Sequence, residues 1–153
     1  MYETLLVVHS ALRWLVVLAG LWAVASAFTA ARRREWTPAD GRPGLFFVLG
    51  LDLQLLVGLA LFLFFSPITR AALLDLGGAM RSSASRFWIV EHPTLMIAAV
   101  VLAHVGRVAA RRAGSYRAGN RAQFWFALAM VAVLLATPWP FGGHARPWFR
   151  LPF

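Results

Sequence analysis

Four long apolar stretches constrain the fold of this chain more than any other feature. They run at about residues 4–30, 45–66, 87–110 and 122–139. Each is close to the roughly 20 residues that a helix rising about 1.5 Å per residue needs to cross about 30 Å of hydrocarbon. Uninterrupted apolar runs also lack the alternation of a membrane barrel strand. We therefore predict an all-α fold, an integral membrane four-helix bundle that forms a single membrane domain over residues 1–153.

The composition agrees with a membrane protein. Hydrophobic residues make up 60% of the chain and charged residues only 14%, whereas soluble domains carry about a quarter charged residues. The first stretch contains Glu3, His9 and Arg13, so we expect a retained helix rather than a cleaved signal sequence. No segment is left that is polar enough for a soluble domain.

The basic residues predict the orientation. All 15 are arginine, and nine lie in or beside the first and third loops: Arg32, Arg33, Arg34, Arg42, Arg107, Arg111, Arg112, Arg117 and Arg121. By the positive-inside rule these loops face the cytoplasm of a bacterial inner membrane. Both termini, the connection 67–86 and the tail 140–153 then lie on the periplasmic side. Because orientation accounts for the net charge of +9, we expect membrane lipid as a partner and no nucleic acid.

Several classes of chemistry are excluded by what the sequence lacks. Without cysteine, disulfides, iron–sulfur ligation, thiol catalysis and covalent haem attachment are impossible. There is no glycine-rich phosphate loop and no nucleophile elbow, and we predict no catalytic residue. Classical nucleotide and hydrolase chemistry is therefore not expected.

His9 and His92 are the strongest candidates for cofactor ligands. His9 lies about six residues into the first apolar stretch and His92 about five into the third, so both are expected roughly 7 to 9 Å below the same surface. Diagonal helices of a bundle can present two such imidazoles to opposite faces of one iron. Ligation by two histidines fills both axial positions of a haem and favours electron transfer.

Arg13 and Gly20 share a helical face with His9. At 3.6 residues per turn, Arg13 lies one turn deeper and Gly20 returns to within about 20 degrees of His9. Such a face suits a flat cofactor, with a ligand, a propionate partner and room for the ring; Arg86 and Arg146 are further candidate propionate partners. The alternative is structural: Arg13 extends toward the headgroups, and Gly20 permits close helix packing.

The residues beside His92 affect its expected depth. Pro93 disfavours helical geometry at the preceding residue and fits best in the first turn of a helix, which would raise His92 toward the surface. Glu91 either orients the His92 ring or caps the helix start.

A second polar set is expected in the inner half of the bundle. Asp52, Gln54 and His104 lie near one level, and form either a buried ion pair or proton relay or a structural contact between helices. His104 is a weaker metal-ligand candidate, because twelve residues turn it about 120 degrees away from His92.

Two segments outside the spans have possible roles. The stretch 71–76 in the outer connection is expected to lie on the membrane surface as a short helix or to cover the outer site. The aromatic tail, with His144, Arg146 and Arg150, is expected to anchor at the interface, cap the site or bind a partner.

Scattered positions along nearly the whole chain carry a resemblance. They are His9-Ser10 with Arg13-Trp14, Asp52 and Gln54 ahead of Gly58, Ser66-Pro67, Arg86-Phe87 with Glu91-His92-Pro93, His104 with Gly106-Arg107, and Pro138-Trp139-Pro140. Together they resemble small four-helix bacterial membrane proteins commonly labelled cytochrome b. The resemblance implies non-covalent haem b with His9 and His92 as ligands, and His104 is the position that matches it less well.

Three functions follow as expectations. The first is a haem b protein that transfers electrons, as a small subunit of a larger membrane redox complex with other subunits or redox partners. The second is a structural or assembly subunit without a cofactor. The third is a proton or small-solute conduit that uses Asp52 and His104.

Overall fold

The computed structural model describes residues 1–141 and 146–147, and this part of the chain contains helices but no strand. Four helical segments are long and apolar enough to cross a membrane: Tyr2–Arg33, Pro38–Phe65, Ser83–Arg112 and Ser115–Ala136. The predicted all-α membrane bundle is confirmed. Most of the predicted tail 140–153, including His144 and Arg150, lies outside the described residues.

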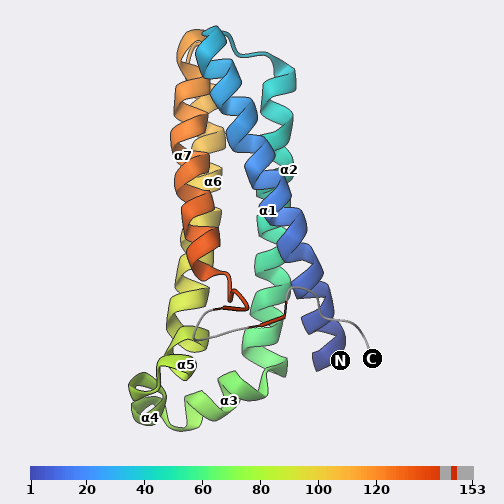
Figure 1. Cartoon of the computed structure of the whole chain (residues 1–153), viewed down its shortest axis with the longest axis vertical. Coiled ribbons are helices and arrows are strands. Elements are labelled where there is room, and N and C mark those ends of the chain that lie inside the picture. The colour runs from blue at the N-terminus through green and yellow to red at the C-terminus, as the bar shows by residue number, and fades with distance from the viewer. Residues whose placement is uncertain (142–145, 148–153) are drawn as a thin grey trace.

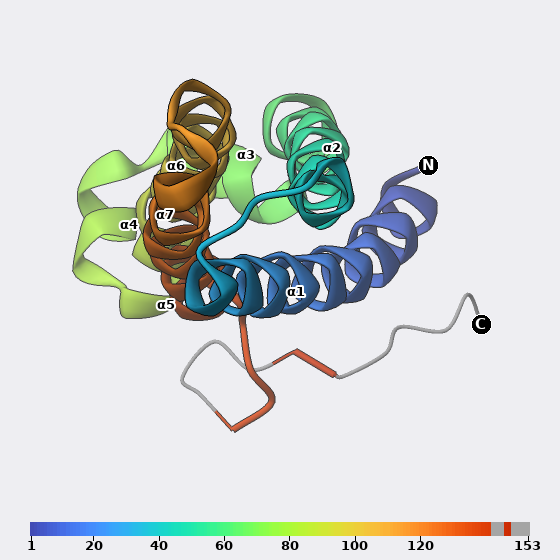
Figure 2. The same cartoon turned by 90° about the horizontal axis from the view of Figure 1, so that it is seen from above.

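The four long helices form a ring in which each contacts two others. They are α1 (Tyr2–Arg33), α2 (Pro38–Ala60), α6 (His92–Arg112) and α7 (Ser115–Ala136). Helix α1 packs against α2 and α7, and α6 packs against the same two helices (Figures 1 and 2). Helices α1 and α6 are therefore diagonal, which is the arrangement predicted for the helices that carry His9 and His92.

Helix α2 begins seven residues before the predicted start, because a polar cap precedes its apolar part. Thr37 is the N-cap and Pro38 the first helical residue, a position that suits proline. The Asp40 carboxylate accepts from the Thr37 backbone N–H at 2.8 Å and pairs with Arg33 at 2.8 Å. Helix α7 likewise begins in polar sequence, at Ser115 rather than residue 122.

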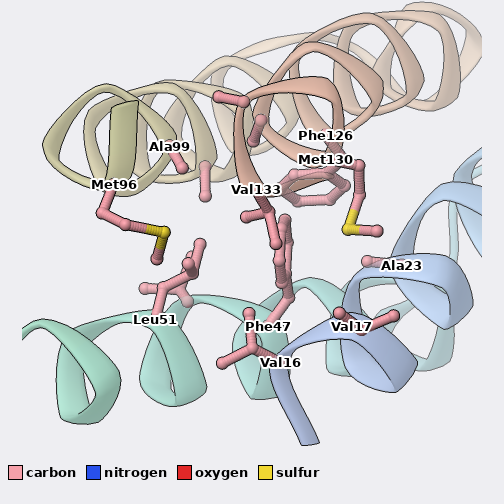
Figure 3. Packing of buried hydrophobic residues seen from close by; sticks show 14 of the residues in the cluster. Val16, Val17, Ala23, Phe47, Leu51, Met96, Ala99, Phe126, Met130 and Val133 are labelled. Atoms are coloured by element: carbon pink, nitrogen blue, oxygen red, sulfur yellow. The ribbon is translucent and has the colours of Figure 1, made fainter. Parts of the chain in front are cut away.

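The core is built from a few large side chains among many small ones. Phe47, Leu51 and Val16 are fully buried, and the Phe47 and Phe126 rings meet edge to face with centroids 6.1 Å apart (Figure 3). Around them the buried residues are mostly alanine and glycine. Small residues let membrane helices approach closely, since lipid gives little hydrophobic drive for helix association.

Large apolar side chains cover the outside of the bundle. Leu15, Leu18, Leu49, Leu56 and Phe124 are each more than half exposed. Soluble monomers rarely expose apolar surface on this scale, whereas hydrocarbon is the natural solvent for such a surface.

The two ends of the bundle differ. At one end the α1–α2 and α6–α7 loops meet, since the Trp36 backbone N–H donates to Ser115 Oγ at 2.7 Å. The nine arginines that lie in or beside these two loops are therefore gathered at this end of the bundle. The other end holds the N-terminus and three short helices, α3 (Pro67–Leu74), α4 (Leu76–Arg81) and α5 (Ser83–Arg86) (Figure 1).

The connection 67–86 therefore differs in detail from the prediction. The helix expected over 71–76 begins earlier, at Pro67, because Ser66 caps it by accepting from the Thr69 N–H at 3.2 Å. It ends at Leu74, and Asp75 then caps α4 by accepting from the Gly78 N–H at 2.8 Å.

Candidate functional site

A cavity of about 130 Å³ lies inside the bundle near the end that holds α3 to α5. Its walls come from α1, α2, α6, α7 and the connection between α2 and α6. Most lining side chains are apolar, and the polar ones include Ser10, Arg13, Gln54, Ser66, Thr69, Thr137 and Arg146. His9 and His92 both line it.

The structure brings His9 and His92 together, as the sequence predicts. Their ring centroids are 6.2 Å apart and the ring planes are inclined by 68°. His9 comes from α1 and His92 from α6, the diagonal pair, so the two imidazoles face each other across the bundle interior.

Pro93 lies in the first turn of α6, as expected, but His92 before it is helical, which corrects the expectation of non-helical geometry there. The His92 backbone has φ −60° and ψ −54°. The preceding residues, Phe87–Glu91, form a π-helical turn (η2) in which the His92 N–H donates to the Phe87 carbonyl. Proline lacks an N–H and clashes with the carbonyl four residues before it. The wider turn accommodates Pro93, so His92 is not raised out of the helix.

The end of α7 fixes the His92 ring. His92 Nδ1 lies 2.8 Å from the carbonyl oxygen of Ala136, the last residue of α7. That carbonyl is among the last four of the helix, which have no partner within it. Because a carbonyl only accepts, Nδ1 donates and Nε2 keeps its lone pair. This hydrogen bond is the usual outer-shell support of a metal-binding histidine.

Gln54 holds the other histidine. Its amide nitrogen donates to the His9 carbonyl at 3.1 Å and lies 3.2 Å from His9 Nε2. The Gln54 amide thus donates to Nε2 and occupies its lone pair, so His9 could bind a metal through Nε2 only once this contact is released. Both His9 Nδ1 and Gln54 Oε1 are buried without a hydrogen-bond partner in the described part of the chain. Buried polar atoms without partners are costly, so these two atoms favour a bound polar group.

Gln54 corrects the sequence prediction, which grouped it with Asp52 and His104. Residues two positions apart on a helix are separated by about 200 degrees around its axis. Asp52 and Gln54 therefore occupy opposite faces of α2, and Gln54 points into the outer cavity. Gly58, one turn further, leaves room for the His9 ring: an added Cβ would lie 3.1 Å from His9 Cε1.

Two of the three predicted propionate partners line the cavity. An Arg13 Nη2 hydrogen bond of 3.5 Å reaches the Pro147 carbonyl, and the Arg146 guanidinium lies 4.9 Å from the Trp88 ring centroid. Arg86 instead forms an ion pair with Glu91 at 2.8 Å and is not a lining residue. Glu91 thus neutralises Arg86 and forms no described bond to His92.

Gly20 lies away from the cavity. An added Cβ there would lie 2.8 Å from Phe47 Cε2 and would also collide with Met130. These two side chains occupy the space beside Gly20, so its role in the structure is close packing, which was the structural alternative.

Asp52 and His104 meet on the outside of the bundle. His104 Nε2 is 3.5 Å from Asp52 Oδ2, with 48% and 39% of the two side chains exposed. His104 Nδ1 bonds back to the Val100 carbonyl at 3.0 Å. Neither side chain lines the outer cavity, so the structure separates His104 from His9 and His92.

The protein offers few ligands to a bare metal ion. Among residues 1–141 and 146–147, no three His, Cys, Asp or Glu side chains gather as a ligand set. His9 and His92 supply two nitrogen atoms, which suffice only for a metal that brings its other ligands with it.

The sequence analysis missed two features of this site. The Ala136 carbonyl is a backbone group, so the pattern of side chains does not reveal it. Pro138 does indicate that α7 ends nearby, and the last carbonyls of a helix have no partner within it. Trp88 carries no recognisable signal, because its contact with Arg146 depends on where the chain returns after α7.

Comparison with protein-family models, with characterised proteins and with solved structures finds no match to this chain.

Proposed function

We propose that this protein is a haem b membrane protein that transfers electrons, with His9 and His92 as axial ligands. The observation that carries the proposal is the 6.2 Å separation of the two imidazole centroids. An imidazole–metal bond is about 2.0 to 2.1 Å for zinc, and the ring centroid lies about 1.2 Å behind the bonding nitrogen, so two rings bound on opposite sides of one metal would have centroids about 6.4 Å apart. The observed separation is close to this value.

The donor set supports haem over a bare ion. His9 and His92 would offer two nitrogen ligands to the iron, and a porphyrin would bring the remaining ones. The Ala136 carbonyl already fixes the tautomer that leaves His92 Nε2 available. A haem b held by both histidines would supply one-electron transfer at this site.

The charged residues that line the cavity would bind the carboxylates at the edge of the cofactor. Arg13 and Arg146 would neutralise its carboxylates through charge-assisted hydrogen bonds, while Val16, Met96 and Val133 exclude water. The cavity of about 130 Å³ is smaller than the roughly 300 to 1,000 Å³ of typical ligand pockets. The described residues would therefore enclose only part of a porphyrin ring.

The exposed Asp52–His104 pair supports assembly with other membrane subunits. In a bilayer this pair, about half exposed, would face hydrocarbon, where charged groups cost at least about 2.5 kcal/mol. A neighbouring protein that covers it removes that cost. Electron transfer also needs partners that supply and accept electrons. By the positive-inside rule the arginine-rich loops would lie in the bacterial cytoplasm.

The test is a titration of the purified protein with haemin. We expect a Soret band that saturates at one haemin per chain and that is lost in His9→Ala and in His92→Ala. His104→Ala is the matched control, since it removes the same side chain from outside the cavity, and it should bind haemin normally. Equal binding by all three variants would contradict the assignment of His9 and His92.

A further inference from the structure

A second hollow, of about 300 Å³, lies at the opposite end of the bundle from the histidines. It is formed where the start of α2 approaches the last turns of α6. Its lining includes Arg42, Arg107, Arg111, Trp36, Gly41 and Phe126. The residues proposed to bind haem take no part in it.

Three arginines line this hollow. Arg107 and Arg111 are one helical turn apart and share a face of α6, and Arg42 comes from the first turns of α2. Arg107 is partly buried, whereas Arg42 and Arg111 are exposed. Like charges brought together in this way repel each other unless an anion separates them.

The chain supplies no such anion in the part that the structure describes. Its ion pairs are Arg33–Asp40, Arg86–Glu91 and His104–Asp52, so no carboxylate pairs with the three arginines of the hollow. Asp40, the acidic group nearest in sequence to Arg42, is already bound by Arg33 and by Thr37. The positive end of the α2 dipole adds to the charge near Arg42, whereas Arg111 lies in the last turn of α6, where the negative end of that helix offsets part of its charge.

The apolar part of the hollow fits a lipid. The Trp36 ring lies against Gly41, where an added Cβ would be 3.8 Å from that ring. The Trp36 backbone N–H donates to Ser115 Oγ. Tryptophan is characteristic of the level at which headgroups meet acyl chains. Phe126 and Leu45 continue the apolar wall.

We infer that this hollow binds the phosphate of an anionic phospholipid, with Arg42, Arg107 and Arg111 around the phosphate and the chains along the outer faces of α2 and α6. Basic pockets between membrane helices are suited to such headgroups. Free phosphate offers the same chemistry, and the experiment separates the two sources.

The experiment titrates delipidated protein in a non-ionic detergent with phosphatidylglycerol, with phosphatidylcholine of the same chains, and with inorganic phosphate. Native mass spectrometry counts bound lipid, and thermal melting reports on all three ligands. We expect phosphatidylglycerol to bind more tightly than phosphatidylcholine. Since a basic residue near a membrane contributes about 1 kcal/mol, Arg42→Gln should weaken phosphatidylglycerol binding about fivefold.

Two further variants locate the effect. The triple variant R42Q/R107Q/R111Q should lose the preference for phosphatidylglycerol. R112Q/R117Q/R121Q removes the same charge from the same end of the bundle but leaves the hollow intact, and should keep the preference. Arg42 is exposed, so the single variant tests the idea even if the triple variant fails to fold.

Equal losses in the two triple variants would overturn the inference, since diffuse charge would then explain binding. Stabilisation by inorganic phosphate that depends on Arg42, without a preference between the two lipids, would overturn the lipid assignment in favour of a soluble anion. Either result leaves the haem titration unaffected, because that site lies at the other end of the bundle.

Discussion

Gly119 is the position where a single methyl group should disturb the bundle most directly. An added Cβ would lie 2.7 Å from Ala31 Cα and 2.9 Å from the carbonyl carbon of Ala30, whereas carbon atoms in contact are about 3.5 to 4.0 Å apart. These are backbone atoms of α1, so α1 and α7 must separate locally by about 1 Å. Overpacking of this kind costs about 1 to 3 kcal/mol, and the better helix propensity of alanine returns about 1 kcal/mol.

We therefore expect Gly119→Ala to destabilise the protein by up to about 2 kcal/mol, which is a fall in melting temperature of up to roughly 8 °C for a chain of this size. Gly119→Val should melt lower still. The assay is thermal unfolding in detergent followed by circular dichroism. Gly114→Ser is the control, because nothing lies within 4 Å of an added Cβ there. A Gly119→Val protein that melts with the wild type would refute the close contact of α1 and α7.

Three other perturbations test the site and its surroundings. Gln54→Ala removes both hydrogen bonds to His9 and frees the Nε2 lone pair that a metal would need, so the variant should bind haemin at least as tightly as the wild type in the same titration; a loss of affinity would mean that His9 does not bind iron through Nε2. Asp52→Asn should change the stability of the isolated protein by less than about 1 kcal/mol. On native gels of solubilised membranes, however, the variant should separate from larger assemblies. If it still migrates with them, another subunit does not depend on the Asp52–His104 pair for binding. Haemin at about 100 times its dissociation constant should stabilise the fold by about 2.7 kcal/mol, or roughly 5 to 11 °C, and no shift in melting temperature would count against a site inside the folded bundle.

The bundle could be predicted from sequence because membrane insertion depends on simple quantities. Apolar length gives the four spans, and the even number of crossings between the first and third brings His9 and His92 to one end. The residues at which helices begin were harder to predict from the sequence. Thr37 and Asp40 form a polar cap that hydropathy does not detect. The sequence places Pro93 in the first turn of a helix, as observed, but the π-helical turn that keeps His92 helical cannot be foreseen from the residue types.

The placement of polar side chains depended on which face each helix buries. Asp52 and Gln54 are close in sequence and similar in depth, yet one pairs with His104 on the surface and the other with His9 in the cavity. Gly20 shares a face with His9 on an ideal helix, but Phe47 and Met130 from two other helices fill the space beside it. Such outcomes follow from tertiary packing, which one chain read alone does not specify.

The most direct test of the central claim is the absorbance spectrum of the protein purified from its native membrane, recorded oxidised, reduced, and reduced under carbon monoxide. We expect a Soret band that shifts on reduction and is unchanged by carbon monoxide, because His9 and His92 together would leave the iron no site for the gas. A folded protein that is colourless and takes up no haemin would contradict that claim.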